Sequence, residues 1–246
     1  MRIGAIIQAR MTSRRLPGKV LAEVHGRPMM QYLLERVERC TELDGVVVAT
    51  STDPSDDPIE SFCVERGVDC FRGSLDNVAE RFREAAQRHG LDAFVRLCAD
   101  SPLLDPALID QAVATYRSSG ADLVTNVIGR TFGPGQSVEV ISAPVFAEAV
   151  PHMISADDRE HVSTYFYDHS KDFRIKAIRS DHDGGDVDFA IDTPEDLERF
   201  RALVAAMDRP HWSYSLAELI DLQRAVAAAA VGASIGRGPA DDKGAR

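Results

Sequence analysis

One segment of the sequence combines the side chains that bind phosphate groups. Residues 8–19, which we call the cationic loop, directly follow an apolar run at residues 3–7. The cationic loop carries four cations and two hydroxyl groups, namely Arg10, Thr12, Ser13, Arg14, Arg15 and Lys19. Arg offers a planar fork of donors and Lys a mobile point charge, and both suit a polyphosphate. Because ligands of open α/β sheets bind outside the carboxyl ends of the strands, this position favours a phosphate site.

Two common phosphate-binding motifs do not describe the cationic loop. A Walker A loop needs a glycine where this chain has Ser13 and a hydroxyl residue where it has Val20. The loop also lacks the G-x-G-x-x-G pattern of a dinucleotide-binding turn. A solvated basic loop without a ligand is the simpler alternative, since charge clusters usually face solvent. The position after an apolar run favours the phosphate site over that alternative.

Two aspartates follow other apolar runs and could hold a metal ion. Asp100 comes after the run ending at Cys98, and Asp192 comes after the run ending at Ile191. If the two carboxylates meet at one edge of a sheet, they could share Mg²⁺, which uses one or two carboxylates together with substrate phosphates. The alternative is that each Asp merely caps a helix. Asp105 and Thr193, each directly before a proline, fill those cap positions instead.

The elements that position these residues are expected to form one α/β domain with a mainly parallel sheet, because apolar runs alternate with segments of helical period. The expected strands are Ile3–Gln8, Val46–Thr50, Phe94–Cys98, Leu123–Asn126, Val138–Ile141, Phe173–Ile178 and Val187–Ile191. Apolar residues at helical spacing within 30–37, 78–86 and 108–116 predict helices that cover the sheet.

Several residue pairs mark helix starts. An N-cap residue followed by proline occurs at Asp57, Asp105 and Thr193. Ser215 with Glu218 predicts the capping box of a last helix. We expect a single domain at residues 1–230 and a flexible tail at residues 231–246, where Gly, Ala and charged residues show no apolar period.

Composition and charge exclude several classes of protein. The chain has 28 Lys and Arg against 39 Asp and Glu, a formal net charge of −11. A negative field repels polyanions, so no nucleic-acid partner is expected. No run approaches the roughly 20 apolar residues that cross a bilayer, and the N-terminal run is too short for a secretory signal. We therefore expect a cytoplasmic protein without membrane insertion. The four cysteines form no C-x-x-C pair, which argues against a zinc cage.

Six motifs together resemble a known enzyme family. They are I-I-Q-A-R-M-x-S-x-R-L-P-G-K-V-L at residues 6–21, V-V-V-A-T at 46–50, F-R-G-S at 71–74, D-S-P-L-L-D at 100–105, R-E-H-V at 159–162 and I-D-T-P-E-D-L-E at 191–198. In this order they resemble the spore-coat-polysaccharide-type cytidylyltransferases, relatives of the acylneuraminate and 3-deoxy-manno-octulosonate cytidylyltransferases. The resemblance implies a three-layer, Rossmann-like nucleotidyltransferase fold of the glycosyltransferase-A type.

The resemblance also implies an activity. A cytidylyl group would pass from CTP to a sugar or sugar-acid-like acceptor with Mg²⁺ and release of pyrophosphate. The product would serve surface glycan, flagellar glycan or specialised metabolite synthesis. Relatives are often dimers, so a homodimer is expected.

Site residues follow from the matched motifs. The resemblance places Arg10, Ser13, Arg15 and Lys19 on the triphosphate and the backbone of Ala9 and Arg10 at the base, whereas Arg14 stands where relatives carry a small hydroxyl residue. Asp100 and Asp192 would bind the metal ion, and Arg10, Lys19 and Asp100 would act in catalysis. Asp100 and a metal-bound hydroxide both stay open as general base. Further substrate contacts are expected at Arg72, Ser74, Cys98, Glu139, Arg159 and His161.

Departures from the family pattern leave rival functions open. Cys98–Ala99 replaces Thr or Gln followed by Gly, and residues 134–137 lack two acids that relatives carry before Glu139. Two D-x-D sequences, at residues 181–183 and 186–188, also match metal-dependent glycosyltransferases, although short acidic turns usually face solvent. The alternatives are a nucleotide-sugar-dependent glycosyltransferase of the same fold and a non-catalytic nucleotide-binding partner.

Overall fold

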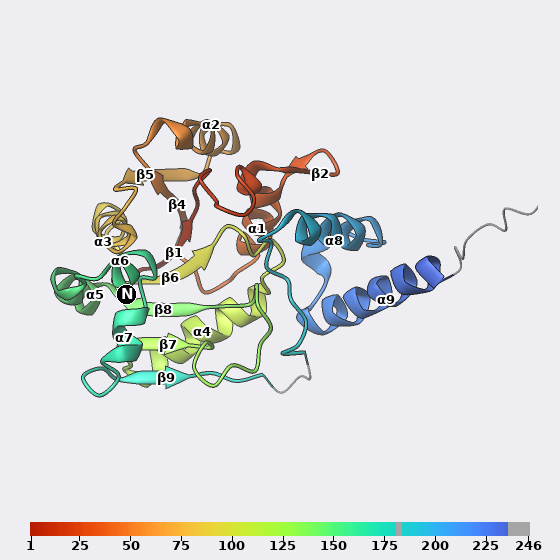
Figure 1. Cartoon of the computed structure of the whole chain (residues 1–246). Helices are drawn as coiled ribbons and strands as arrows, with labels where there is room; N and C mark the ends of the chain where they lie inside the picture. Colours follow the sequence, from red (N-terminus) through yellow and green to blue (C-terminus); the bar gives the residue numbers. More distant parts are fainter. Residues whose placement is uncertain (181–183, 236–246) are drawn as a thin grey trace, which may run out of the picture.

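A seven-stranded sheet lies at the centre of the computed structural model, which describes residues 1–180 and 184–235 (Figure 1). The strand order is β5-β4-β1-β6-β8-β7-β9. These strands are β1 (Ile3–Gln8), β4 (Val46–Ser51), β5 (Asp69–Gly73), β6 (Ala93–Cys98), β7 (Leu123–Thr125), β8 (Glu139–Ser142) and β9 (Ile175–Ala177). Strands β2 (Glu23–Val24) and β3 (Arg27–Pro28) form a separate hairpin.

The helices connect these strands. The α-helices are α1 (Met29–Val37), α2 (Asp57–Arg66), α3 (Val78–Arg88), α4 (Pro106–Ser119), α5 (Ala143–Ala149), α6 (Ala156–Glu160), α7 (Thr164–Asp168), α8 (Pro194–Ala205) and α9 (Leu216–Ile235). Short 3₁₀ helices are η1 (Lys19–Leu21), η2 (Pro54–Asp56), η3 (Val150–His152) and η4 (His211–Ser213).

The sheet is mainly parallel, as predicted. Strand β1 runs parallel to both of its neighbours, β4 and β6, and β5 is parallel to β4. Strand β8 alone in this sheet is antiparallel to the strands beside it, and β9 is again parallel to β7. The carboxyl ends of β1 and β6 therefore lie side by side, and the cationic loop and Asp100 leave the sheet there.

The strand assignments differ from the sequence prediction at Val187–Ile191, at β5 and at the β2–β3 hairpin, which was not predicted. The segment Val187–Ile191 was expected to be a strand, but it does not pair with a neighbouring strand of the sheet. The Phe189 amide donates to the Pro134 carbonyl and the Ile191 amide to the Asp100 carbonyl, and both carbonyls lie in loops. Strand β5 was not expected, and it forms the edge next to β4.

Helix starts follow the predicted caps closely. The side chains of Asp105 and Thr193 cap α4 and α8, and Ser215 and Glu218 exchange the two hydrogen bonds of a capping box. At α2 the helix begins one residue earlier than expected, at Asp57.

Helix α9 continues to Ile235, so the tail expected from residue 231 begins inside a helix, and residues 236–246 lie outside the described part. No helix in the described ranges is long and apolar enough to span a membrane.

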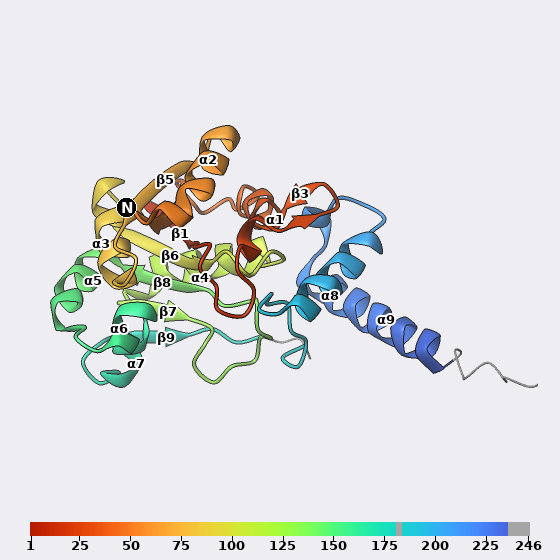
Figure 2. The ribbon, with the colours of Figure 1, turned by 45° about the horizontal axis from the view of Figure 1, so that its top comes forward.

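Helices cover both faces of the sheet and bury an apolar core on each, which confirms the three-layer prediction (Figures 1 and 2). On one face the core includes Leu33 of α1 and Ile109 of α4. On the other face Phe82 of α3 and Phe146 of α5 pack over Phe94. Helices α8 and α9 lie beside one end of this body (Figure 1). Asp192 directly precedes Thr193, the N-cap residue of α8.

A buried arginine attaches the C-terminal segment to α1. Arg36 has no exposed surface, and its guanidinium group donates to the carbonyls of Leu104 at 2.8 Å, His211 at 2.5 Å and Tyr214 at 3.0 Å. Burial lowers the pKa of Arg36 to about 10, so the group remains a cation at neutral pH. Three carbonyl acceptors, with the Asp105 carboxylate 4.0 Å away, compensate for its loss of water.

Candidate active site

Lys19 joins the two aspartates that the sequence singled out. Its Nζ lies 2.9 Å from Oδ2 of Asp100 and 2.9 Å from Oδ1 of Asp192. The same nitrogen donates to the Ile191 carbonyl at 2.7 Å, and Lys19 is only 7% exposed. An ammonium group with three short acceptors is fixed in place, because each of its hydrogens is used. Lys19, Asp100 and Asp192 therefore form one site.

The backbone explains why these residues meet. Asp100 stands two residues beyond the end of β6, and the Ile191 amide donates to the Asp100 carbonyl at 2.9 Å. This bond fixes the segment before α8 against the end of β6. Gly18, with φ of +73°, turns the chain so that η1 begins at Lys19. Lys19 is buried after this turn, whereas Arg14 and Arg15 of the cationic loop are exposed.

The two carboxylates are close enough to be considered together as ligands of one divalent cation. One oxygen of each lies 2.9 Å from Nζ of Lys19, so these two oxygens are at most 5.8 Å apart, and the second oxygen of each carboxylate is not bonded to Lys19. Carboxylate oxygens are ligands that Mg²⁺ prefers, and its remaining ligands are usually water and substrate phosphates. No group of three or more Asp, Glu, His or Cys side chains able to hold a metal occurs among residues 1–180 and 184–235. Substrate oxygens and water would have to complete the coordination.

Two other cations of the loop also contact carboxylates. Arg10 pairs with Glu160 of α6, with 2.8 Å between Nη2 and Oε1. Arg15 pairs with Asp192, with 2.8 Å between Nη2 and Oδ2. Arg14 is exposed, and within the part of the chain that the structure describes it has neither an ion pair nor a hydrogen-bonded side chain. The loop is thus largely neutralised by acids from the C-terminal half.

Backbone contacts hold the start of the cationic loop. The Met11 amide donates to Oδ1 of the buried Asp56 at 2.7 Å, and the Gly18 amide donates to the Met11 carbonyl at 2.8 Å. Ala9 is buried, and its amide donates to Ala49 of β4. Ser13 is half-buried and accepts a long bond of 3.4 Å from the Leu16 amide. Hydrogen bonds therefore fix the first residues of the cationic loop, whereas Arg14 and Arg15 in its middle are exposed.

Arg72 and Ser74 lie on the side of β5 and α2. Arg72 donates to the Ser51 carbonyl at 2.8 Å and pairs with Asp57 and Glu60 of α2. The pKa of Arg72 is raised by the hydrogen bond to Asp57. Ser74 accepts from the Asn77 amide in the turn before α3. The structure does not place these two residues in contact with Lys19, and their substrate role stays a prediction.

A largely buried polar cluster, which we define as Arg96, Glu139, Tyr167 and Thr125, joins strands β6, β8 and β7 to helix α7. Arg96 Nη1 is 2.7 Å from Glu139 Oε2, and the Tyr167 hydroxyl bonds both Glu139 and Thr125. Glu139 is 2% exposed, and Nε of Arg96 is buried without a partner among the described atoms. Glu139 was predicted as a site residue and Arg96 was not, although an arginine within the apolar run of β6 is a signal that indicates such a position.

Cys98 ends β6 in register with Gln8 of β1. Burial raises the pKa of its thiol to about 11, so it is neutral under ordinary conditions. A neutral thiol offers a weak donor at the place where a base contact is expected.

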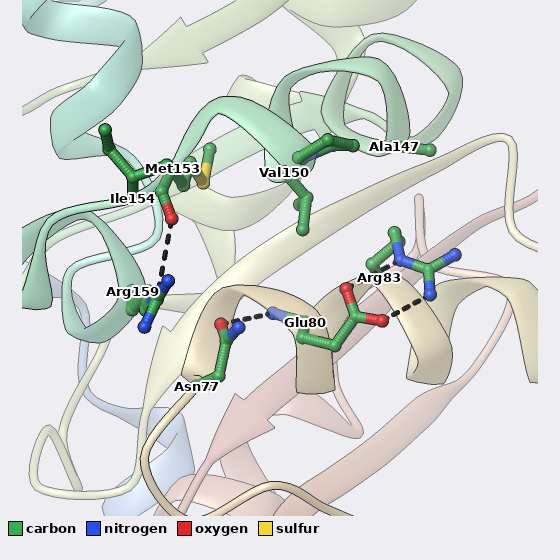
Figure 3. A pocket seen from close by; sticks show the side chains of 9 residues that line it. Asn77, Glu80, Arg83, Ala147, Val150, Met153, Ile154 and Arg159 are labelled. Carbon is green, nitrogen blue, oxygen red and sulfur yellow. Dashed lines mark hydrogen bonds and ion pairs between the residues drawn. The ribbon is translucent and has the colours of Figure 1, made fainter.

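The R-E-H-V motif places its residues in different surroundings. Arg159 lines a cavity of about 350 Å³ with Asn77, Glu80 and Arg83 of the α3 region, opposite Val150 (Figure 3). Its Nε donates to the Met153 carbonyl at 3.3 Å. His161 is exposed, 3.6 Å from Asp157. The residue between them, Glu160, is the one that reaches Arg10.

The D-x-D sequence at residues 181–183 lies outside the described part of the chain. The one at residues 186–188, which the structure describes, makes no hydrogen bond or ion pair with Lys19, Asp100 or Asp192. Asp186 is exposed and pairs with Arg224 of α9 at 3.1 Å, and Oδ1 of Asp188 accepts from the Ala190 amide. Asp186 lies in a turn and Asp188 in the segment after it, and both are exposed, in line with the expectation that short acidic turns face solvent.

The fold and the site define a nucleotidyltransferase, and comparison with known proteins identifies the family. Residues 4–226 match the family model described as cytidylyltransferase. The chain is 32% identical to the spore coat polysaccharide biosynthesis protein SpsF of Bacillus subtilis, over 88% of this chain and 92% of that protein. It is 30% identical to a 3-deoxy-manno-octulosonate cytidylyltransferase of Anaeromyxobacter dehalogenans, over 83% of this chain and 98% of that enzyme.

A solved structure supports the same family assignment. The structure of a cytidylyltransferase from Leptospira borgpetersenii superposes with a TM-score of 0.85 at 28% identity, covering 94% of this chain and 96% of that one. The chain belongs to the cytidylyltransferase family. The resemblance drawn from the motifs is thereby confirmed, and the glycosyltransferase alternative loses its support.

Proposed function

We propose that this protein transfers the cytidylyl group of CTP to a hydroxyl group of a sugar-acid-like acceptor and releases pyrophosphate, with a divalent cation, Mg²⁺, at Asp100 and Asp192. The observation that carries the proposal is the position of Lys19 between these two carboxylates. A fixed cation and two acids that could bind a metal ion then lie together near the carboxyl ends of β1 and β6.

Lys19, Arg10 and Arg15 have different roles in the proposed reaction. Lys19 is held rigidly and stabilises negative charge on the triphosphate without rearrangement. Arg10 and Arg15 exchange their carboxylate partners for phosphate oxygens, for which a guanidinium fork is well suited. When bound, the divalent cation supplies neutralisation of phosphate charge. Most of the rate enhancement then comes from holding the acceptor hydroxyl in line with the α-phosphorus.

Relatives support the acceptor class. The relative from Anaeromyxobacter dehalogenans is named for a sugar acid, and SpsF is named for polysaccharide biosynthesis. We propose a sugar-acid-like acceptor for this chain on that basis. The polar cluster around Arg96 and Glu139 lies next to β1 and provides donors and acceptors for such a molecule. A cytoplasmic location and a homodimer stay part of the proposal, and sedimentation of the purified protein tests the dimer.

Calorimetric titration with CTP, UTP, ATP and GTP in the presence of Mg²⁺ tests the nucleotide. We expect CTP to bind at least about tenfold more tightly than the others, a difference of ~1.4 kcal/mol. Pyrophosphate release is then measured with CTP and a panel of 3-deoxy-manno-octulosonate, N-acetylneuraminate and neutral hexoses. Purine binding as tight as CTP binding would remove the cytidylyl assignment, and turnover with hexoses alone would remove the sugar-acid class.

A further inference from the structure

Asp192 differs from Asp100 in that cations contact both of its oxygens. Oδ1 of Asp192 accepts from Lys19 at 2.9 Å, and Oδ2 lies 2.8 Å from Arg15. Oδ2 of Asp100 accepts a hydrogen bond from Lys19, and its Oδ1 accepts a long hydrogen bond of 3.4 Å from the Ser101 hydroxyl. The outer oxygen of Asp100 is therefore nearly free for a metal ion, whereas the outer oxygen of Asp192 is engaged by a cation.

The two cations on Asp192 differ in mobility. The Lys19 side chain is 9% exposed and also bonded to the Ile191 carbonyl, so it cannot leave without stranding buried polar groups. The Arg15 side chain is 64% exposed, and within residues 1–180 and 184–235 it forms no hydrogen bond or ion pair other than the one with Asp192. An exposed ion pair contributes little to stability and is easily exchanged. Arg15 can thus move and Lys19 cannot.

We propose that Arg15 occupies the metal-binding oxygen of Asp192 until a triphosphate draws it away, so that the aspartate pair binds its divalent cation mainly together with nucleotide. The inference rests on the proposed function, because it takes Asp100 and Asp192 as the metal ligands. A triphosphate carries several negative charges against the single charge of Asp192, and it offers oxygens to the same guanidinium fork. Once Arg15 turns to phosphate, Oδ2 of Asp192 is free.

The exchange has a thermodynamic consequence. If nucleotide strengthens cation binding, the cation strengthens nucleotide binding by the same factor. A free cation would then gain little by entering the site alone, and the cation would bind as part of the nucleotide complex. Arg15 would act as a positioning residue that links the two binding events.

Binding of Mn²⁺ alone tests the competition directly. The unbound ion is measured by electron paramagnetic resonance in the absence of nucleotide, for the wild type, Arg15→Ala and Arg14→Ala. Both variants lose one positive charge from the same loop, but only Arg15 contacts Asp192, so Arg14→Ala is the matched control. We expect Arg15→Ala to bind Mn²⁺ about fivefold more tightly than Arg14→Ala, the upper range for an exposed ion pair. Adding Asp192→Asn to Arg15→Ala should abolish the gain.

A second measurement tests the link to nucleotide. CTP affinity is determined by calorimetry with and without saturating Mn²⁺, and the ratio of the two affinities gives the coupling. We expect a smaller ratio for Arg15→Ala than for Arg14→Ala. Thermal unfolding confirms that the variants fold, as expected for exposed side chains.

The possible failures are distinguishable. Equal Mn²⁺ affinities for Arg15→Ala and Arg14→Ala, or no Mn²⁺ binding by either, would overturn the role of Arg15. Because this first measurement contains no nucleotide, it stands whatever the base preference proves to be. Failure of the proposed function would appear instead as the absence of CTP preference in the wild type.

Discussion

Glu160 of α6 forms an ion pair with Arg10 of the cationic loop, although 150 residues separate them. Nη2 of Arg10 and Oε1 of Glu160 are 2.8 Å apart, and both side chains are about one-third exposed, at 34% and 30%. A carboxylate therefore holds the guanidinium group that is expected to bind phosphate. If Arg10 binds phosphate as proposed, Glu160 and the nucleotide would compete for the same guanidinium group.

The first prediction concerns this competition. Glu160→Gln removes the competing charge, so we expect CTP to bind about two- to fivefold more tightly, in line with an exposed ion pair of up to ~1 kcal/mol. Arg10→Ala should weaken CTP binding by ~10-fold or more, because a charge-assisted bond to phosphate is lost. Calorimetric titration measures both. Weaker CTP binding by Glu160→Gln would indicate that Glu160 orients Arg10 and does not compete for it.

Lys19 is expected to matter for stability as well as for catalysis. Lys19→Met leaves two carboxylates facing each other without their shared cation, and we expect a loss of about 1–3 kcal/mol in the free energy of unfolding together with loss of turnover. Adding Asp192→Asn should recover part of the stability and none of the activity, which a double-mutant cycle in urea can resolve. Full stability of Lys19→Met would show that the carboxylates are well solvated without it.

The aspartate pair should act as a unit. Asp100→Asn and Asp192→Asn keep the shape of each side chain but remove charge that a cation needs, so each should abolish pyrophosphate release. The double variant should be little worse than either single variant. If the loss of activity in the double variant equals the product of the losses in the two single variants, the two residues serve separate steps. Asp186→Asn is the control, since its carboxylate pairs with Arg224 at the surface.

Much of the fold could be predicted because apolar patterning reports burial. Strand β1 has the predicted bounds, Ile3–Gln8. The same pattern misled at Val187–Ile191, where buried Val187, Phe189 and Ile191 alternate with more exposed residues as in a strand. Alternation reveals which side chains are buried, but it does not reveal whether the backbone has a neighbouring strand. Strand β5 was missed for the opposite reason, since Asp69 and Arg72 make this edge strand look polar.

The site was predicted in part. The residue types and strand ends indicated Lys19, Asp100 and Asp192, and the structure brings them together. Glu160 was missed although its motif was noted, because side-chain direction in the short helix α6 depends on where the helix begins. The capping box of Ser155 with Asp158 sets the start of α6, and this capping box was not predicted from the sequence.

The four cysteines should differ in reactivity. A hydrogen bond from Cys63 lowers the pKa of Cys70, whereas burial raises the pKa of Cys98 to about 11 and of Cys40 to about 12. The pKa of Cys63 is raised, first by its hydrogen bond to Cys70. Since the thiolate is the nucleophile, Cys70 should reach its reactive form at the lowest pH. Iodoacetamide at pH 8 followed by peptide mass spectrometry should find Cys70 alkylated first. Earlier modification of Cys98 or Cys40 would contradict this order.

The carbonyl contacts of Arg36 impose an order on folding during synthesis. Helix α1 leaves the ribosome early, but two of the three acceptors of Arg36 belong to residues 211 and 214, near the end of the chain. Until they arrive, sealing this face would bury an uncompensated cation, so the guanidinium group must stay in water. A chain that ends before His211 lacks two of the three carbonyl acceptors of Arg36, so this part of the fold closes only when synthesis is nearly complete.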